Sequence, residues 1–392
     1  MDMYKGDSPV KELYRRLPVM ESEDGELDEE ERVKAIAGPL LSWFGSNARE
    51  LPWRNNQEPY PVWISEIMLQ QTRVEAVKPY FKRFMEQFPN VEALAKAEEE
   101  KLLKLWEGLG YYSRARNLKK AAAIMLEEYG GTMPKTYEAL LKLPGIGTYT
   151  AGAVASIAYK IPVPAVDGNV MRVLSRLLES RQDIGKPQTK KKFETLLLSA
   201  MEQKEPGLFN QGLFEVGALV CIPNGAPKCS LCPLASLCKT RKKGLWDEIP
   251  VKSSKKGRKI EEKTVFVISG QKEEKEWVAL RKRSDQGLLA SLYEFPNVEG
   301  HVKLECIKEE PLKFGNILQI LGVAEEQIQQ VEFLGEAKHI FSHVEWHMVG
   351  YRIRIGNSQP ESFVLADIQE LEGKYPLPNA FLAYRKALFK AK

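Results

Sequence analysis

The chain lacks any apolar run of the roughly 18 residues that a membrane-spanning helix needs. Its N-terminus, MDMYKGDSPV, also lacks the basic and then apolar pattern of a signal peptide. These absences argue against a membrane or secreted protein, so we expect an intracellular protein whose cysteines are reduced. The composition is 43% hydrophobic and 28% charged, which is typical of globular proteins, and 392 residues predict two or more domains.

Basic residues are missing from residues 21–31, ESEDGELDEEE, which contain eight acids. The net charge of the whole chain is +4, so the rest of the chain sums to +12. A second concentration of charge lies in residues 239–259, with nine basic and two acidic residues. Such an excess of positive charge suits a polyanionic partner.

Strong strand patterns are absent before residue 240, where apolar residues recur at helical spacing. Strand-like alternation begins with TVFVIS and EWVALRKR and returns in HIFSHVEWHMVGYRIRI. We therefore predict a multidomain protein with an all-α domain followed by a smaller α+β domain. The predicted bounds are a polar leader at 1–30, the α domain at 31–240, a basic linker at 241–262 and the α+β domain at 263–392.

Four of the five cysteines fall within 18 residues, with the spacing C-x7-C-x2-C-x5-C. They are Cys221, Cys229, Cys232 and Cys238. Four thiolates this close suit tetrahedral zinc or a cubane iron–sulfur cluster, and the single C-x2-C pair favours the cluster over a zinc ribbon. Unliganded buried cysteines are the alternative. The segment contains no carboxylate or histidine, so the predicted metal site is structural.

LPGIGTYTAG, residues 143–152, predicts a helix, a tight turn and a second helix. Gly145 and Gly147 let the backbone approach a ligand, and the amide groups that open the second helix can bind a phosphate. An ordinary helix–helix turn remains the alternative. Asp167, in VPAVDGNVMRVLSRL, precedes another helix, where an aspartate most often serves as the N-cap.

Glu66 lies in an otherwise mostly apolar stretch, PVWISEIMLQQT. On a helix its neighbours three and four residues away are Val62, Trp63, Leu69 and Gln70. Three of the four are apolar, and such surroundings disfavour the ionised form, so we expect a raised pKa for Glu66.

Together these motifs resemble the helix-hairpin-helix DNA glycosylases with an iron–sulfur cluster and, within them, the adenine DNA glycosylase family. The resemblance covers roughly residues 32–392. Its further markers are LPWR, WISEIMLQQT, GLGYYSRARNL, FNQGLFEVGALVC, GLLASLYEFPNVE and HIFSH. It implies one 4Fe-4S cluster held by the four cysteines, and a C-terminal Nudix-like domain that recognises 8-oxoguanine.

The resemblance also implies an activity: hydrolysis of the N-glycosidic bond of adenine paired with 8-oxoguanine or guanine in double-stranded DNA, by a monomer. Glu66 is then the proton donor to the flipped adenine, and Asp167 stabilises or attacks the sugar cation. Two carboxyl groups with different pKa values serve this chemistry, as in glycoside hydrolysis.

The hairpin contains no lysine where the endonuclease III branch of the family has one. Tyr149 stands there instead, and a phenol cannot form a Schiff base with the sugar. The sequence therefore predicts a monofunctional glycosylase with little strand cleavage. A glycosylase with lyase activity and a DNA-binding protein without catalysis are the competing hypotheses; the tyrosine opposes the first, and both carboxylates oppose the second.

Further positions match the family's DNA and base contacts. Those that resemble residues entering or lining the duplex are Leu69, Gln71, Thr72, Leu109, Gly110 and Tyr111, and those that resemble the adenine pocket are Trp53, Arg54 and Gln211. Ser342, in HIFSH, resembles the contact to 8-oxoguanine. Core aromatics, a surface amide and a strand-edge serine are the alternatives for several of them.

Three features depart from the family pattern. The first cysteine gap has seven residues where the family usually has six, and the 30-residue leader falls outside the pattern. The C-terminal domain lacks the glutamate-rich Nudix helix, since EFPNVEG is followed by HVKLECIKEEPL. We therefore expect that domain to bind and not to hydrolyse pyrophosphate.

Overall fold

A computed structural model describes residues 27–201, 205–253, 257–272, 275–302, 321–356, 360 and 362–389. The chain divides into two compact units, Met1–Lys96 with Asn117–Ser254, and Ala97–Arg116 with Lys255–Lys392. Most of the predicted leader, residues 1–26, and the segment 303–320, where a Nudix helix would lie, are outside the described residues. The second unit includes Ala97–Arg116, a short piece of the predicted α domain, where Lys104 donates to the carbonyls of Leu371 and Tyr375.

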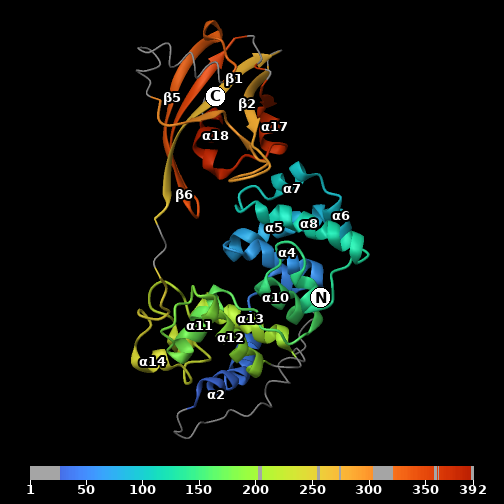
Figure 1. Cartoon of the computed structure of the whole chain (residues 1–392), viewed down its shortest axis with the longest axis vertical. Coiled ribbons are helices and arrows are strands. Elements are labelled where there is room, and N and C mark those ends of the chain that lie inside the picture. The colour runs from blue at the N-terminus through green and yellow to red at the C-terminus, as the bar shows by residue number, and fades with distance from the viewer. Residues whose placement is uncertain are drawn as a thin grey trace, which may run out of the picture. The chain divides into compact units, whose positions relative to one another are not determined.

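All the regular secondary structure in the described residues of the first unit is helical (Figure 1). Its helices are α2 (Glu29–Lys34), α3 (Ala37–Asn47), η1 (Pro52–Arg54), α4 (Pro59–Leu69), α5 (Val74–Gln87), α6 (Val91–Ala95), most of α8 (Ser113–Glu128), α9 (Tyr137–Leu141), α10 (Thr148–Tyr159), α11 (Gly168–Leu178), α12 (Pro187–Ala200), α13 (Pro206–Glu215), η2 (Val216–Val220), η3 (Cys229–Leu231) and α14 (Lys239–Lys243). Residues of α2, α3, α11, α12 and α13 share one core, which continues to the cysteine segment through Leu234. Apolar burial of this kind is the main stabilising term of such a unit.

The second unit contains the sheet that the sequence predicts. Its elements are α7 (Glu99–Leu105), β1 (Lys259–Lys272), β2 (Lys275–Lys282), β3 (Tyr293–Glu294), β4 (Asn297–Glu299), η4 (Glu325–Gln327), β5 (Ile328–Ile340), β6 (Val344–Ile355), β7 (Val364–Asp367), α17 (Ile368–Gly373), η5 (Asn379–Phe381) and α18 (Leu382–Phe389). The strand order is β3-β2-β1-β6-β5, with β4 pairing β1 and β7 pairing β2. β1 and β6 are parallel, whereas β1 is antiparallel to β2, and β5 to β6.

Both faces of this sheet are covered, and alternation along β1 explains how. Val265 and Val267 face a core that includes residues of α17 and α18, while Phe266 and Ile268 face a second core. This is the period of two that a strand imposes on its side chains. In Figure 1, α18 lies against the strands, as its core contacts require.

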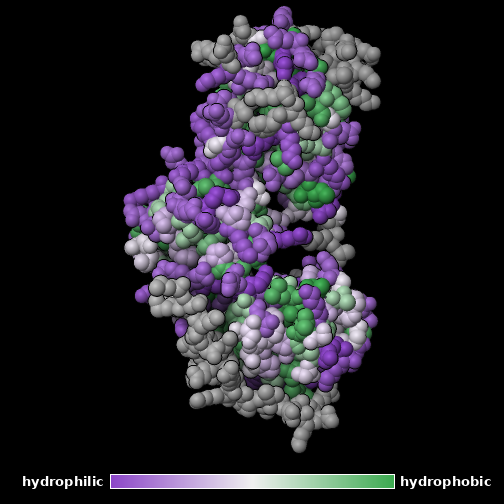
Figure 2. Space-filling model, turned by 180° about the vertical axis from the view of Figure 1, so that it is seen from behind, coloured by the Kyte–Doolittle hydropathy of each residue, from purple (hydrophilic) through white to green (hydrophobic). Residues whose placement is uncertain are grey.

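Hydrophilic residues predominate on the face of the molecule seen in Figure 2, and hydrophobic residues form scattered patches there. Within the described parts of the chain, no helix is both long enough and apolar enough to span a membrane.

Candidate functional site

The largest concentration of predicted site residues lines one cavity in the helical unit. The lining includes Trp53, Arg54, Glu66, Leu69, Thr72, Tyr149, Asp167 and Gln211, all of them sequence candidates. They come from η1, α4 and the turn after it, α10, the start of α11, and α13. Residues far apart in the sequence, from Trp53 to Gln211, thus meet at one cavity.

Glu66 lies near the end of α4 and is only 5% exposed. The Tyr149 hydroxyl donates a hydrogen bond of 2.5 Å to its Oε2. Burial raises the pKa of Glu66 to about 7; the hydrogen bond from Tyr149 opposes the rise, the charge of Asp167 adds to it, and the positive charge of Arg54 also opposes it. The direction is the one that the apolar neighbours in the sequence predict. A carboxyl group with this pKa holds its proton about half of the time at neutral pH.

Tyr149 belongs to the first turn of α10, directly after the hairpin. Burial and the nearby Glu66 and Asp167 raise the pKa of its phenol well above the ordinary value, so it stays a hydrogen-bond donor at neutral pH. Its ring packs at 5.6 Å from that of Phe214, another lining residue.

Asp167 caps α11, as its position before the helix predicts. Its Oδ1 accepts from the amides of Asn169 and Val170 at 2.9 and 2.8 Å, and its Oδ2 accepts from Asn169 Nδ2 at 2.8 Å. Burial raises the pKa of Asp167, and these three hydrogen bonds oppose the rise by stabilising the ionised form. The carboxylate is therefore held rigidly at the cavity wall.

Asn169 is not among the sequence candidates, although it stands in the stretch VPAVDGNVMRVLSRL that contains Asp167. It joins Asp167 to Arg172, whose Nη2 donates to Asn169 Oδ1 at 2.9 Å. A Cβ added to Gly217 would lie 2.6 Å from Asn169 Cβ, so glycine is needed where η2 passes this residue. A glycine in FEVGALVC is the sequence signal of that close approach.

The adenine-pocket candidates also meet. Trp53 is buried and packs edge-on against Phe81 at 5.4 Å, so it contributes to the core and to the cavity wall together. Arg54 Nε donates to Gln211 Oε1 at 3.0 Å. Burial lowers the pKa of Arg54, and the carboxylate of Glu215 opposes that shift.

The two turns expected at the duplex have unusual backbone conformations. Gln71, just beyond α4, has φ = 58°, and Tyr111 has φ = 49° directly after Gly110 at 69°. Positive φ in a residue other than glycine is strained and is often found at functional sites. Leu109 is buried, whereas Tyr111 is 45% exposed.

Tyr111 and Ser342 lie together in the second unit. The Tyr111 hydroxyl and Ser342 Oγ are 3.0 Å apart, although the residues are 231 positions apart in the chain. Arg114 fixes the Tyr111 turn, because its Nη2 donates to the carbonyls of Leu109 and Gly110. Two of the predicted recognition residues thus form one surface contact.

In the hairpin, only one of the two glycines is required by its conformation. Gly145 has φ = 78°, and a Cβ there would lie 2.8 Å from Asn117 Cβ. Gly147 is the N-cap of α10 with an extended backbone and open space around it. The hairpin geometry therefore supports the turn, and Gly147 leaves the helix amides uncovered.

The four cysteines are free thiols that line a second cavity, together with Arg176 and Trp246 among others. Arg176 Nη1 lies 3.4 Å from Cys221 Sγ, and Arg172 Nε donates to the Cys221 carbonyl at 2.7 Å. Four thiols are the type of donor that an iron–sulfur cluster or zinc takes, although their present spacing is wider than a single ion such as zinc needs. Over the described ranges, no three His, Cys, Asp or Glu side chains gather closely enough for a single metal ion.

Comparisons with known proteins relate the chain to a family of repair proteins. Residues 64–198 match the HhH-GPD superfamily of base excision DNA repair proteins, and residues 264–387 match the NUDIX domain. An adenine DNA glycosylase of Buchnera aphidicola is 36% identical over 78% of this chain and 82% of its own length. That of Homo sapiens is 34% identical over 85% of this chain and 69% of its own. A solved endonuclease III–DNA complex is 26% identical, with a TM-score of 0.48, over 56% of this chain and 99% of that one.

Proposed function

Because the chain belongs to the adenine DNA glycosylase family and is thus a DNA glycosylase, we propose that it removes adenine paired with 8-oxoguanine or guanine in duplex DNA. One observation carries the proposal. A single cavity combines a buried acid whose pKa is about 7, a phenol bonded to it and a helix-capping carboxylate. Cleavage of a glycosidic bond uses two carboxyl groups of this kind, one to donate a proton to the leaving group and one to stabilise the sugar.

Glu66 gives its proton to N7 of the flipped adenine. Tyr149 donates to Glu66 Oε2, which leaves Oε1 to carry the acid proton. As the proton arrives, the C1′–N9 bond breaks and its electron pair leaves with the base. An acid of this pKa is suited to the step at neutral pH.

Asp167 stabilises the positive charge that develops on the sugar. Its hydrogen bonds to the amides that open α11 favour the ionised form against the burial that raises its pKa, and they fix the carboxyl group in place. A water molecule then adds to C1′ and returns a proton to the Glu66 carboxylate, which restores the acid. No amine takes part, so the product is an abasic site in an uncut strand.

The Tyr111–Ser342 contact is the proposed site of 8-oxoguanine recognition. Both hydroxyl groups can donate or accept, so together they can bond to a base edge that carries an additional carbonyl and N–H group. The strained turn at Tyr111 and its exposed ring suit contact with a base opposite the adenine.

The cysteine segment is proposed to hold one 4Fe-4S cluster through Cys221, Cys229, Cys232 and Cys238. The cluster would fix the loop that α11 and α14 flank, and it takes no part in the glycosidic chemistry. Iron and acid-labile sulfide in the purified protein, with visible absorbance from thiolate-to-iron charge transfer, would support it. A colourless protein that contains zinc would contradict it.

The partner is proposed to be double-stranded DNA, bound by a monomer inside the cell. The basic balance of the chain outside residues 21–31 suits the phosphate backbone. Affinity for DNA should therefore fall steeply as salt is raised.

The test is incubation of the protein with a duplex that contains adenine opposite 8-oxoguanine. We expect sites that break only after alkali treatment, because the abasic product remains in an intact strand. Strand breaks without alkali would point to a lyase, and the absence of alkali-labile sites would contradict the proposal.

A further inference from the structure

Glu215 is a buried carboxylate that the proposed mechanism does not use. Its side chain is completely buried near the end of α13, where Arg49 Nε lies 2.8 Å from Oε2 and Arg54 Nη1 lies 2.6 Å from Oε1. Both arginines line the base cavity, whereas Glu215 does not. A buried charge is costly unless it is paired, so this pairing fixes all three side chains.

Arg54 passes this constraint to Gln211. Arg54 Nε donates to Gln211 Oε1 at 3.0 Å, and Gln211 Nε2 donates to the Gly207 carbonyl at 3.2 Å. A guanidinium can only donate and a carbonyl can only accept. Turning the amide over would place N–H against N–H and oxygen against oxygen, so both bonds hold Gln211 in one orientation.

Arg54 is itself held on several sides. Its Nη1 also donates to the Arg49 carbonyl at 3.0 Å, and its guanidinium lies 5.3 Å from the centre of the Phe44 ring. Without Glu215, the ion pair that compensates the buried charge of Arg54 is lost, and Arg54 no longer presents its Nε–H at a fixed point.

We propose that Glu215 is a positioning residue for base specificity: through Arg54 it locks the Gln211 amide so that the cavity accepts a 6-aminopurine and rejects a 6-oxopurine. This rests on the proposed excision of adenine. The C6 amino group of adenine donates hydrogen bonds, whereas the C6 carbonyl of hypoxanthine or guanine accepts them. A locked amide matches one of these groups, but an amide that is free to turn matches either.

The test compares single-turnover excision of adenine and of hypoxanthine, each opposite 8-oxoguanine, in the native protein and in Glu215→Gln. Within one variant, the ratio of the two rates is unaffected by a general loss of activity. Comparing this ratio between variants removes the effect of the different leaving abilities of the two bases. We expect the adenine-to-hypoxanthine ratio to fall about tenfold in Glu215→Gln, because one discriminating hydrogen bond is lost. Glu205→Gln is the matched control, since that residue precedes the same helix and pairs with the exposed Lys160; its ratio should stay native.

Two further variants make the result decisive. In a Gln211→Ala background, Glu215→Gln should leave the ratio unchanged, since no amide remains to be oriented. Arg54→Ala leaves Glu215 paired with Arg49 and should lower the ratio as Glu215→Gln does, so the proposal stays testable even if Glu215→Gln fails to fold.

Equal losses on both bases, with a native ratio, would overturn the positioning role and leave Glu215 a merely structural residue. A native protein that excises neither base would overturn the proposed function and this inference with it. If the native protein excises adenine but the adenine-to-hypoxanthine ratio is the same in Glu215→Gln, only the inference is overturned.

Discussion

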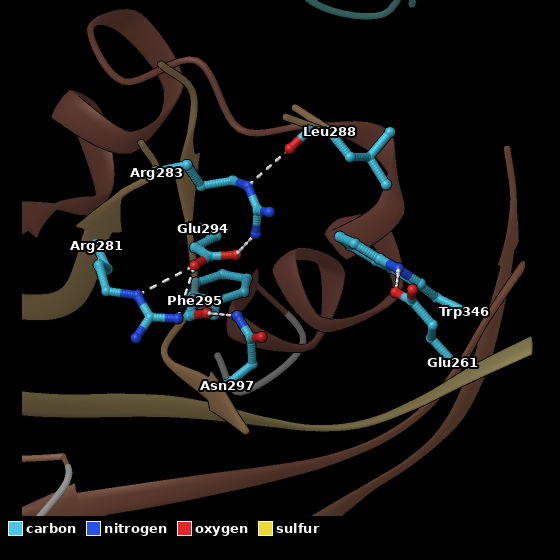
Figure 3. A network of polar contacts seen from close by, with 8 residues as sticks. All are labelled: Glu261, Arg281, Arg283, Leu288, Glu294, Phe295, Asn297 and Trp346. Carbon is cyan, nitrogen blue, oxygen red and sulfur yellow. Dashed lines mark hydrogen bonds and ion pairs between the residues drawn. The ribbon is translucent and has the colours of Figure 1, made fainter. Parts of the chain in front are cut away.

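Each unit of the molecule buries a glutamate that holds two arginines, and the two arrangements differ in what the arginines contact next. In the helical unit, Glu215 holds Arg54, which bonds to Gln211 at the wall of a cavity. In the second unit, Glu294 holds Arg283, which bonds to the backbone carbonyl of Leu288 at 3.1 Å (Figure 3).

The second network braces a turn. Arg281 also bonds to Glu294, through Nε at 3.1 Å and Nη2 at 2.8 Å. The turn between β2 and β3 contains Leu289 and Ser291, both with positive φ, so this strained backbone needs hydrogen bonds such as the one from Arg283 to hold it. Both networks include a bond to a backbone carbonyl, but only Arg54 in this comparison also bonds to a side chain that lines a cavity.

Glu66→Gln should produce the largest change, since it removes the acid while keeping the side chain's shape. We expect the single-turnover rate on adenine opposite 8-oxoguanine to fall by about 10²–10⁴-fold, the usual contribution of a general acid. DNA affinity, measured by fluorescence anisotropy, should stay native. Glu58→Gln, at the exposed start of the same helix, is the control. Near-native turnover in Glu66→Gln would refute the proton-donor role.

The same variant should be more stable than the native protein at high pH. The pKa of Glu66 is about 7 in the folded state against an ordinary value of 4.5, so the folded state binds more protons between these pH values. Its stability therefore falls as pH rises from about 4.5 to 7, and the loss is complete above that range. The free energy of unfolding of Glu66→Gln should therefore exceed that of the native protein by roughly 3 kcal/mol at pH 8, with almost no such difference at pH 4.

Urea denaturation at the two pH values measures this difference. A variant equally stable or less stable than the native protein at pH 8 would mean that Glu66 is not held in its neutral form by burial.

Glu294→Gln should have the opposite pattern, a loss of stability with little effect on chemistry. Removing one partner of a buried pair is strongly destabilising, but Arg281 is 43% exposed and can be solvated, so we expect a loss of about 2 kcal/mol. The excision rate per folded molecule on adenine opposite guanine should stay native. Glu299→Gln, exposed and five residues further on, is the control. A tenfold loss of rate in Glu294→Gln would erase the distinction between the two networks.

The sequence predicts the fold well where a local pattern specifies it. Alternation predicts β1, β2 and β6, and apolar residues at helical spacing predict the helical unit. The parallel pairing of β1 with β6 could not be predicted, because no local pattern fixes which distant strand is the neighbour.

At the candidate site, too, only features set by nearby residues could be predicted from the sequence. The cap role of Asp167 and the apolar surroundings of Glu66 are visible within a few residues, so both could be derived locally. The partners of Glu215 could not, since Arg49 lies 166 positions away and an isolated glutamate on a helix is usually exposed. Positive φ at Gln71 has no signal either, because glutamine does not favour it.

The smallest expected effect concerns the neutral contact between Tyr111 and Ser342, which unlike either glutamate network involves no charge. Ser342→Ala removes one hydroxyl, and one neutral hydrogen bond contributes about 1 kcal/mol. We therefore expect the preference for adenine opposite 8-oxoguanine over adenine opposite guanine to fall about fivefold, measured as the ratio of kcat/KM values. Ser284→Ala, an exposed serine in the same unit, should keep the native ratio. Equal losses on the two substrates in Ser342→Ala would mean that this contact only supports the fold, because recognition of the lesion must act on the ratio.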